Sequence, residues 1–161
     1  MDYLTKEVEI NGTTIKLKLW DSAGQEVYHN ITKSYFHKCD GVLIVFDICN
    51  KNSFDYINYW MKQINENTKK IKKVIVGNKS DLQNERIISR EEAEKMASSY
   101  SLKYYEISAK DNVGIDDLMN DLINEIIQEK EKNENNDDHQ GNIELEVANH
   151  QEEKKSYCSY C

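Results

Sequence analysis

The sequence predicts an α/β domain in which helices cover both faces of a mainly parallel sheet. Short apolar runs at 42–46, 74–76 and 104–107 are typical of strands, and segments with helical periodicity alternate with them. The unbroken run at 42–46 suits a strand that is covered on both faces, as strands of parallel sheets are. Polar clusters follow these runs, at the carboxyl ends where such sheets bind their ligands.

The chain is expected to open with two antiparallel strands. Residues 7–10 and 13–19 alternate between apolar and polar side chains, and Asn11-Gly12 separates them. Asn-Gly between alternating runs indicates a tight hairpin, because both turn residues need positive φ.

Three helices are predicted after the hairpin. Apolar residues recur at helical spacing over 53–64 and 115–127, and the second of these is the cleaner amphipathic pattern. Ser89 and Glu92 form a capping-box pattern that opens a helix to about residue 100. The polar segment 24–38 is expected to be a loop with a short helix.

Length and charge point to one folded unit followed by a tail. The 161 residues fit a single domain, and the formal net charge is -8. Residues 128–161 carry nine Asp/Glu and four Lys/Arg, which leaves only -3 for the rest. We therefore expect a domain over 1–128 and a flexible acidic tail over 129–161. The sequence lacks the stripe of basic residues that nucleic-acid binding would need. It also contains no signal peptide and no membrane-spanning apolar run.

Cys39 and Cys49 lie in or beside apolar runs. Small buried thiols in a reducing compartment are expected there, rather than a disulfide.

The cluster Asn78-Lys79-Ser80-Asp81 has the chemistry to recognise guanine. A fixed carboxylate at Asp81 can accept hydrogen bonds from both N1–H and the N2 amine of guanine, whereas adenine lacks that pair of donors. The stem of Lys79 can lie over the purine, Lys110 can cover it, and the backbone N–H of Ala109 can meet the guanine oxygen. Upstream, Asp21 ends a strand, where a carboxylate can hold Mg²⁺ through water.

Taken together, these clusters resemble those of a Ras-superfamily small GTPase of the Rab branch. The matching stretches are Trp20-Asp21-Ser22-Ala23-Gly24-Gln25-Glu26, Val76-Gly77-Asn78-Lys79-Ser80-Asp81-Leu82 and Glu106-Ile107-Ser108-Ala109-Lys110, and Ser34-Tyr35-Phe36 and residues 47–54 are also similar. The resemblance covers residues 1–127.

The resemblance implies roles for individual residues. Asp21 would hold Mg²⁺ through water, the Gly24 backbone would sense the γ-phosphate, and Gln25 would orient the attacking water. The implied guanine pocket consists of Asn78, Lys79, Asp81, Ser108, Ala109 and Lys110. The aromatic triad that meets effectors would be Tyr3, Trp20 and Tyr35, with ordinary core packing as the alternative. Two positions depart from the family pattern: Ser22 stands where Thr is usual, and Val27 where Arg is usual.

The phosphate-binding loop of this class is missing. That loop has the pattern Gly-x-x-x-x-Gly-Lys-Ser/Thr, and none of the six glycines here is followed by Lys. By resemblance the family's first strand, first helix and switch I Thr would precede Tyr3, so the chain is expected to be an N-terminally truncated small-GTPase-like P-loop NTPase domain.

The missing strand leads to an expectation about stability. In the family it lies between the strands here at about 14–20 and 41–47. About five uncovered side chains, each worth about 1.5–3 kcal/mol when buried, would remove roughly 10 kcal/mol from a stability of about 5–15 kcal/mol. The sequence therefore predicts an unstable or partly molten chain that binds GTP poorly.

Two cysteines, Cys158 and Cys161, lie at the end of the sequence. By resemblance to Rabs they suit prenylation, and two lipid chains would give stable anchoring to a membrane. Their Cys-x-x-Cys spacing departs from the commoner Cys-Cys and Cys-x-Cys endings. An exposed thiol pair and half of a zinc site are the alternatives, although His139 and His150 offer no convincing partners.

The leading hypothesis is a switch of vesicle traffic that binds GTP and Mg²⁺ and hydrolyses GTP. It would act with effector and regulator proteins on the cytosolic face of Golgi or endosomal membranes, with the chain as given impaired. The alternative is a nucleotide-independent interaction module, a pseudo-GTPase.

Overall fold

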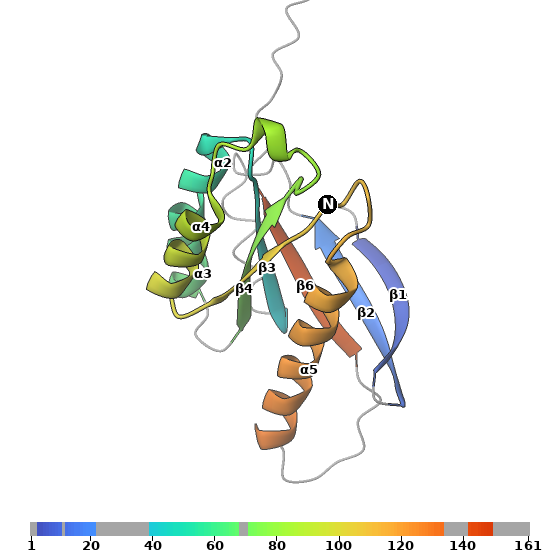
Figure 1. Cartoon of the computed structure of the whole chain (residues 1–161). Helices are drawn as coiled ribbons and strands as arrows, with labels where there is room; N and C mark the ends of the chain where they lie inside the picture. Colours follow the sequence, from blue (N-terminus) through green and yellow to red (C-terminus); the bar gives the residue numbers. More distant parts are fainter. Residues whose placement is uncertain (1–2, 11, 22–38, 68–70, 134–141, 150–161) are drawn as a thin grey trace, which may run out of the picture.

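In the computed structural model, the described residues are 3–10, 12–21, 39–67, 71–133 and 142–149. The strands are β1 (Tyr3–Ile10), β2 (Thr13–Asp21), β3 (Gly41–Asp47), β4 (Lys72–Asn78), β5 (Lys103–Glu106) and β6 (Asn142–Asn149). The helices are α2 (Lys51–Asp55), α3 (Ile57–Asn67), α4 (Arg90–Ser99), α5 (Ile115–Asn133) and the 3₁₀ turn η2 (Gln83–Glu85). The strands form one sheet in the order β1-β2-β6-β3-β4-β5 (Figure 1).

The predicted hairpin is confirmed. Strands β1 and β2 pair antiparallel, with Tyr3 opposite Trp20 and Ile10 opposite Thr13. Gly12 has a φ of 78°, in the left-handed region that a tight hairpin turn requires and glycine adopts without strain.

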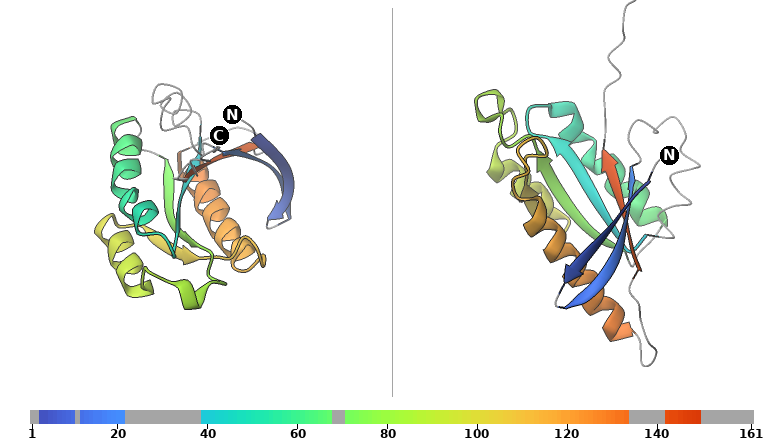
Figure 2. Two further views of the ribbon diagram at one scale, coloured as in Figure 1. Left: turned by 90° about the horizontal axis from the view of Figure 1, so that it is seen from above. Right: turned by 90° about the vertical axis from the view of Figure 1, so that its right-hand side faces the viewer.

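The predicted α/β architecture is also confirmed. Side chains of α2, α3 and α4 pack with Val42, Ile44 and Phe46 on one face of the sheet. On the other face, side chains of α5 pack with Leu43 and Val45 of the same strand. Figure 2 shows α5 and the other helices on opposite sides of the sheet. The alternation of Cβ directions along a strand explains why the apolar run at 42–46 serves two cores.

The predicted N-cap of α4 is present. The Ser89 side chain accepts a hydrogen bond from the backbone N–H of Glu92 at 3.1 Å. The Glu92 carboxylate bonds to Lys51 Nζ of α2 at 2.8 Å, which ties two helices on the same face together.

The tail differs from its prediction. Helix α5 continues to Asn133, and β6 lies inside the sheet, parallel to both β2 and β3. The prediction of a flexible tail from Glu129 onward is therefore wrong for residues 129–133 and 142–149. Despite the acidic composition of this segment, Ile143 and Leu145 bury their side chains in a sheet that the rest of the chain supplies. Residues 134–141 and 150–161 lie outside the described residues.

Strand β6 occupies the place that the resemblance assigned to a missing strand. The side chains expected to be uncovered there are buried: Ile15 and Leu17 are each 2% exposed and Leu43 is 6% exposed. The premise of the predicted instability is therefore wrong, because the chain fills the centre of its sheet with its own later residues.

Candidate functional site

Two of the predicted polar clusters meet at the carboxyl edge of the sheet. Parallel pairing sets Asp47 of β3 beside Asn78 of β4, and Gly77 of β4 beside Glu106 of β5. The loops after β4 and β5 therefore start side by side, and the Ser80 N–H donates to the Ile107 carbonyl at 3.0 Å.

Asn78 joins these two loops. Its Oδ1 accepts hydrogen bonds from the Lys79 N–H at 2.7 Å and from the Ala109 N–H at 3.1 Å. The N–H of Ala109 was expected to meet a guanine oxygen; in this structure it donates to Asn78. Asn78 thus positions the loop that carries Ser108 and Lys110.

Asp81 presents a fixed carboxylate beside this junction. Its Oδ1 accepts a hydrogen bond from Ser108 Oγ at 2.6 Å, and its Oδ2 lies 3.9 Å from Lys110 Nζ. The hydrogen bond from Ser108, reinforced by nearby positive charge, lowers the pKa of Asp81, so the group is an ionised acceptor at neutral pH. Ser108 is itself fixed, since it is buried and its Oγ also accepts from the Asp111 N–H at 3.1 Å.

Lys79 forms an ion pair with a residue of the neighbouring strand at the same edge of the sheet. Its φ of 69° is unusual for a residue with a side chain, and its Nζ lies 2.6 Å from Asp47 Oδ2. The hydrogen bond that Lys79 donates to Asp47 raises the pKa of Lys79 despite the opposing effect of burial. The sequence assigned Asp47 no role of its own; in the structure it is the ion-pair partner that anchors Lys79.

A partly buried ion pair, which the sequence did not predict, stabilises the loop after β5. Arg86 donates to both oxygens of Glu106 at 2.9 Å each, and the Tyr104 hydroxyl donates to Glu106 Oε1 at 2.8 Å. The two charged residues are 20 positions apart, and no periodic pattern in the sequence joins them.

The other predicted site residues are described in part or not at all. Asp21 ends β2, with its backbone beside Val147 of β6, and its side chain is outside the description. Tyr3 and Trp20 contact each other, with ring centroids 4.9 Å apart. Five further predicted residues lie outside the described residues: Gly24, Gln25, Tyr35, Cys158 and Cys161.

Within the described ranges, no three His, Cys, Asp or Glu side chains gather in a way that could hold a metal ion. Neither Cys39 nor Cys49 forms a disulfide within the described residues, but both are partly exposed, whereas buried thiols were expected. None of the described helices is both long and apolar enough to cross a membrane.

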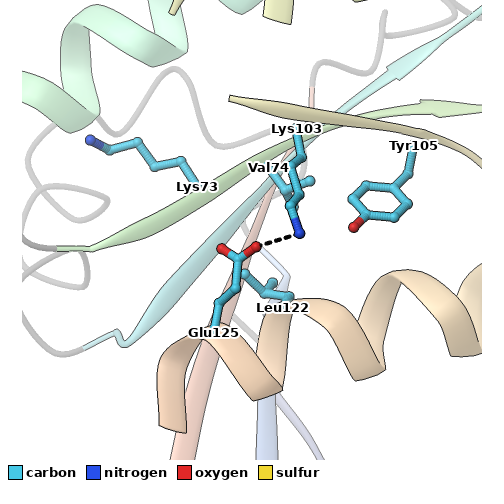
Figure 3. A pocket seen from close by; sticks show the side chains of 6 residues that line it. All are labelled: Lys73, Val74, Lys103, Tyr105, Leu122 and Glu125. Carbon is cyan, nitrogen blue, oxygen red and sulfur yellow. Dashed lines mark ion pairs between the residues drawn. The ribbon is translucent and has the colours of Figure 1, made fainter. Parts of the chain in front are cut away.

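A small hollow elsewhere on the sheet is not a nucleotide site. It lies between β4, β5 and α5, and the ion pair of Lys103 with Glu125, at 2.6 Å, spans it (Figure 3). Its cavity volume of about 10 Å³ is room for a single water, far below the roughly 300 Å³ or more of a ligand pocket.

Comparison with known proteins gives the class of the chain. The sequence model of the Ras family matches residues 1–128. Rab-10 of Caenorhabditis elegans is 41% identical over 128 residues, which are 79% of this chain and 64% of that protein. Rab-8A of Gallus gallus is 35% identical over 159 residues, 98% of this chain and 77% of the relative. Rab-13 of Rattus norvegicus is 38% identical over 128 residues, 79% and 63% respectively.

The chain therefore belongs to the Ras family of small GTPases. Within it, the relatives place the chain in the Rab branch. The chain spans less than two thirds of the length of the Rab-10 and Rab-13 relatives.

Proposed function

We propose that this chain is a Rab-type guanine-nucleotide switch that regulates intracellular vesicle traffic. The observation that carries the proposal is the cluster at the carboxyl edge, where Ser108 holds the ionised Asp81 and Asn78 holds the loop of Ala109. A fixed, ionised acceptor suits the paired donors of guanine and leaves adenine without a match.

The remaining roles follow from the family. Lys79 and Lys110 flank the base, Gln25 orients the attacking water and the Gly24 backbone senses the γ-phosphate. Asp21 would hold Mg²⁺ through water with a carboxylate oxygen, the donor type that this ion prefers. Bound Mg²⁺ supplies charge neutralisation at the phosphates.

The partners and location proposed are those of a Rab. Tyr3, Trp20 and Tyr35 form the surface that effectors contact, and the contact between the first two rings supports this. Prenylation of Cys158 and Cys161 would tether the protein to the cytosolic face of Golgi or endosomal membranes.

A second candidate is a pseudo-GTPase that acts only through protein contacts. The observation that favours it is the absence, in the sequence given, of a glycine followed by the phosphate-binding Lys. The phosphate-binding loop supplies most contacts to the phosphates of a bound nucleotide. If the chain acts as a switch, we therefore expect it to bind GDP weakly and mainly through the guanine base.

Base selectivity is the first test of the proposed function. We expect the purified chain to bind GDP in preference to ADP, measured by competition against a fluorescent GDP analogue. Asp81→Asn places an amide N–H₂ donor opposite the guanine donors, and should reduce this preference by about tenfold to a hundredfold. Asp111→Asn removes an exposed carboxylate from the same edge and is the matched control.

The outcomes separate the two candidates. Equal binding of GDP and ADP, or equal behaviour of the Asp81→Asn and Asp111→Asn variants, would contradict guanine recognition at this site. A cooperatively folded chain that binds neither nucleotide would support the pseudo-GTPase.

A further inference from the structure

The two loops that we propose to hold guanine are joined through the backbone of Ser80. This residue directly precedes Asp81, and its N–H donates to the carbonyl of Ile107 at 3.0 Å. Its own carbonyl accepts a hydrogen bond from Gln83 Nε2 at 2.5 Å. Because both backbone groups of Ser80 are engaged, the position of the carboxylate that follows depends on both contacts.

Gln83 connects the first of these loops to Arg86. It is the first residue of the 3₁₀ turn η2, and its Oε1 accepts a hydrogen bond from Arg86 Nε at 3.1 Å. A glutamine amide can donate through its nitrogen and accept through its oxygen at the same time. The reverse orientation of the amide would set its oxygen against the Ser80 carbonyl and its nitrogen against the guanidinium. The two neighbours therefore fix the side chain in one orientation.

Arg86 carries the connection on to the second loop. It donates to both oxygens of Glu106, the residue before Ile107, and its Nη1 also donates to the carbonyl of Ile88 at 3.1 Å. The side chains of Arg86 and Glu106 are only 18% and 11% exposed, so water competes weakly for these contacts. Since the guanidinium is planar and its donors have a fixed geometry, these bonds hold η2 at one distance from the end of β5.

Tyr104 fixes the Glu106 carboxylate from its own strand. The Tyr104 hydroxyl donates to Glu106 Oε1 at 2.8 Å. It lies over Gly77, where a Cβ would collide with the hydroxyl oxygen. Gly77 immediately precedes Asn78, whose Oδ1 accepts from the N–H of Ala109. The lack of a side chain at 77 thus leaves room for the hydroxyl that holds Glu106 beside the start of the first loop.

These contacts close a ring of residues. The ring runs from the Ser80 carbonyl through the side chains of Gln83, Arg86 and Glu106 to Ile107, whose carbonyl accepts from the Ser80 N–H. A break in the ring would free the Ser80 peptide on one side, and with it the carboxylate of the next residue. That carboxylate has to face two guanine donors at once, so a small displacement leaves one of them without a partner.

We propose that Gln83 is a positioning residue for guanine recognition. Through Arg86 and Glu106 it fixes the spacing between the carboxylate of Asp81 and the N–H of Ala109, and so sets the selectivity for the 2-amine of guanine. The inference rests on the proposed function. It adds that this selectivity depends on an exposed residue outside the predicted pocket.

Competition between GDP and inosine diphosphate on the full chain tests the proposal, with a fluorescent GDP analogue as the probe. Inosine diphosphate keeps the N1–H and the oxygen of guanine but lacks the 2-amine, so the unmodified chain should prefer GDP. Gln83→Ala should reduce this preference by about threefold to tenfold. Asn84→Ala, at the next and also exposed residue of η2, is the control and should leave the preference unchanged. A smaller folded fraction would lower both affinities equally, so the ratio separates positioning from stability.

Gln83→Glu separates the two hydrogen bonds of the glutamine side chain. The carboxylate still accepts from Arg86, and more strongly because it is charged, but it cannot donate to the Ser80 carbonyl. If the ring acts through Ser80, this variant should lose its preference for GDP as Gln83→Ala does, although its contact with Arg86 is retained. A Gln83→Glu variant that keeps the full preference would overturn the proposal.

Amide hydrogen exchange, followed by NMR, tests the ring without a nucleotide. The amides of Ser80 and Ala109 should exchange faster in Gln83→Ala than in the unmodified chain, by about threefold or more, whereas the amide of Ile75 in the buried strand β4 should not change. Unchanged exchange, or an unchanged GDP preference in Gln83→Ala, would overturn the inference and leave the proposed function in place. An unmodified chain that shows no preference for GDP would overturn the proposed function, and the role of the ring in recognition with it.

Discussion

Replacement of Leu145 by alanine is expected to lower the free energy of unfolding by about 2–5 kcal/mol, the range of buried leucine-to-alanine changes. Leu145 has no exposed surface and fills the space beside Gly41, below α5. Gly41 offers no side chain that could relax into the cavity, which favours the upper part of that range. Such a loss is a large fraction of the roughly 5–15 kcal/mol of a whole domain.

Urea unfolding followed by tryptophan fluorescence measures this effect. Trp20 lies on β2 beside β6, and Trp60 lies in the core on the opposite face, so one transition reports on both halves. Leu4→Ala, at an exposed position of β1, is the matched control and should change the free energy of unfolding by less than about 0.5 kcal/mol. Coincident midpoints for the Leu145→Ala and Leu4→Ala variants would show that β6 does not contribute to the folded core.

The same strand marks the limit of prediction from the sequence. The hairpin, the strands at 42–46 and 74–76 and the long C-terminal helix were predicted correctly because their signals are local: turn residues, apolar runs and helical periodicity. Strand β6 carries a local signal too, since Ile143, Leu145 and Val147 alternate with two glutamates. The acidic composition of the surrounding residues nevertheless led to the prediction of a flexible tail. The two strands that pair with β6 lie more than a hundred positions earlier in the chain, so no local pattern could show where it docks.

The candidate site was predictable in part for the same reason. The order of strands placed 78–81 and 108–110 at one sheet edge, and the hydrogen bond from Ser108 to Asp81 confirms that these two segments meet. Whether Asp21 joins them stays a prediction, because its side chain is not described. The ion pairs of Lys79 with Asp47 and of Arg86 with Glu106 depend on side-chain directions in three dimensions, which residue spacing does not encode.

Glu106→Gln is expected to destabilise the chain by about 3 kcal/mol at neutral pH, the lower end of the range for buried pairs, because it leaves the charge of Arg86 without its partner in a largely buried setting. The two side chains are only 11% and 18% exposed, and Arg86 donates two hydrogen bonds to this carboxylate. Glutamine keeps the shape but provides one acceptor oxygen and no charge. The double variant Arg86→Met with Glu106→Gln should recover part of the loss, since it removes the unpaired charge.

An exposed ion pair gives the matched control. Lys51 and Glu92 lie 2.8 Å apart, but their side chains are 49% and 45% exposed, so Glu92→Gln should cost less than about 1 kcal/mol. Chemical denaturation at pH 7 measures all of these variants. A loss for Glu106→Gln no larger than that for Glu92→Gln would contradict the bracing role of the Arg86–Glu106 pair.

The pH dependence of this effect has a definite sign. Burial alone would raise the pKa of Glu106, but the hydrogen bonds from Arg86 and Tyr104 outweigh it, and the pKa lies below its usual value. Because the folded-state pKa is the lower one, the ionised carboxylate contributes its full stability above the unfolded-state value of about 4.3, and loses it as the pH falls through the folded-state pKa. The stability difference between the unmodified chain and Glu106→Gln should therefore be largest at pH 6–7 and shrink steadily below about pH 4. A difference that stays constant down to pH 3 would mean that the charge of Glu106 is not what stabilises the loop after β5, and that glutamine fails there only through its hydrogen bonding.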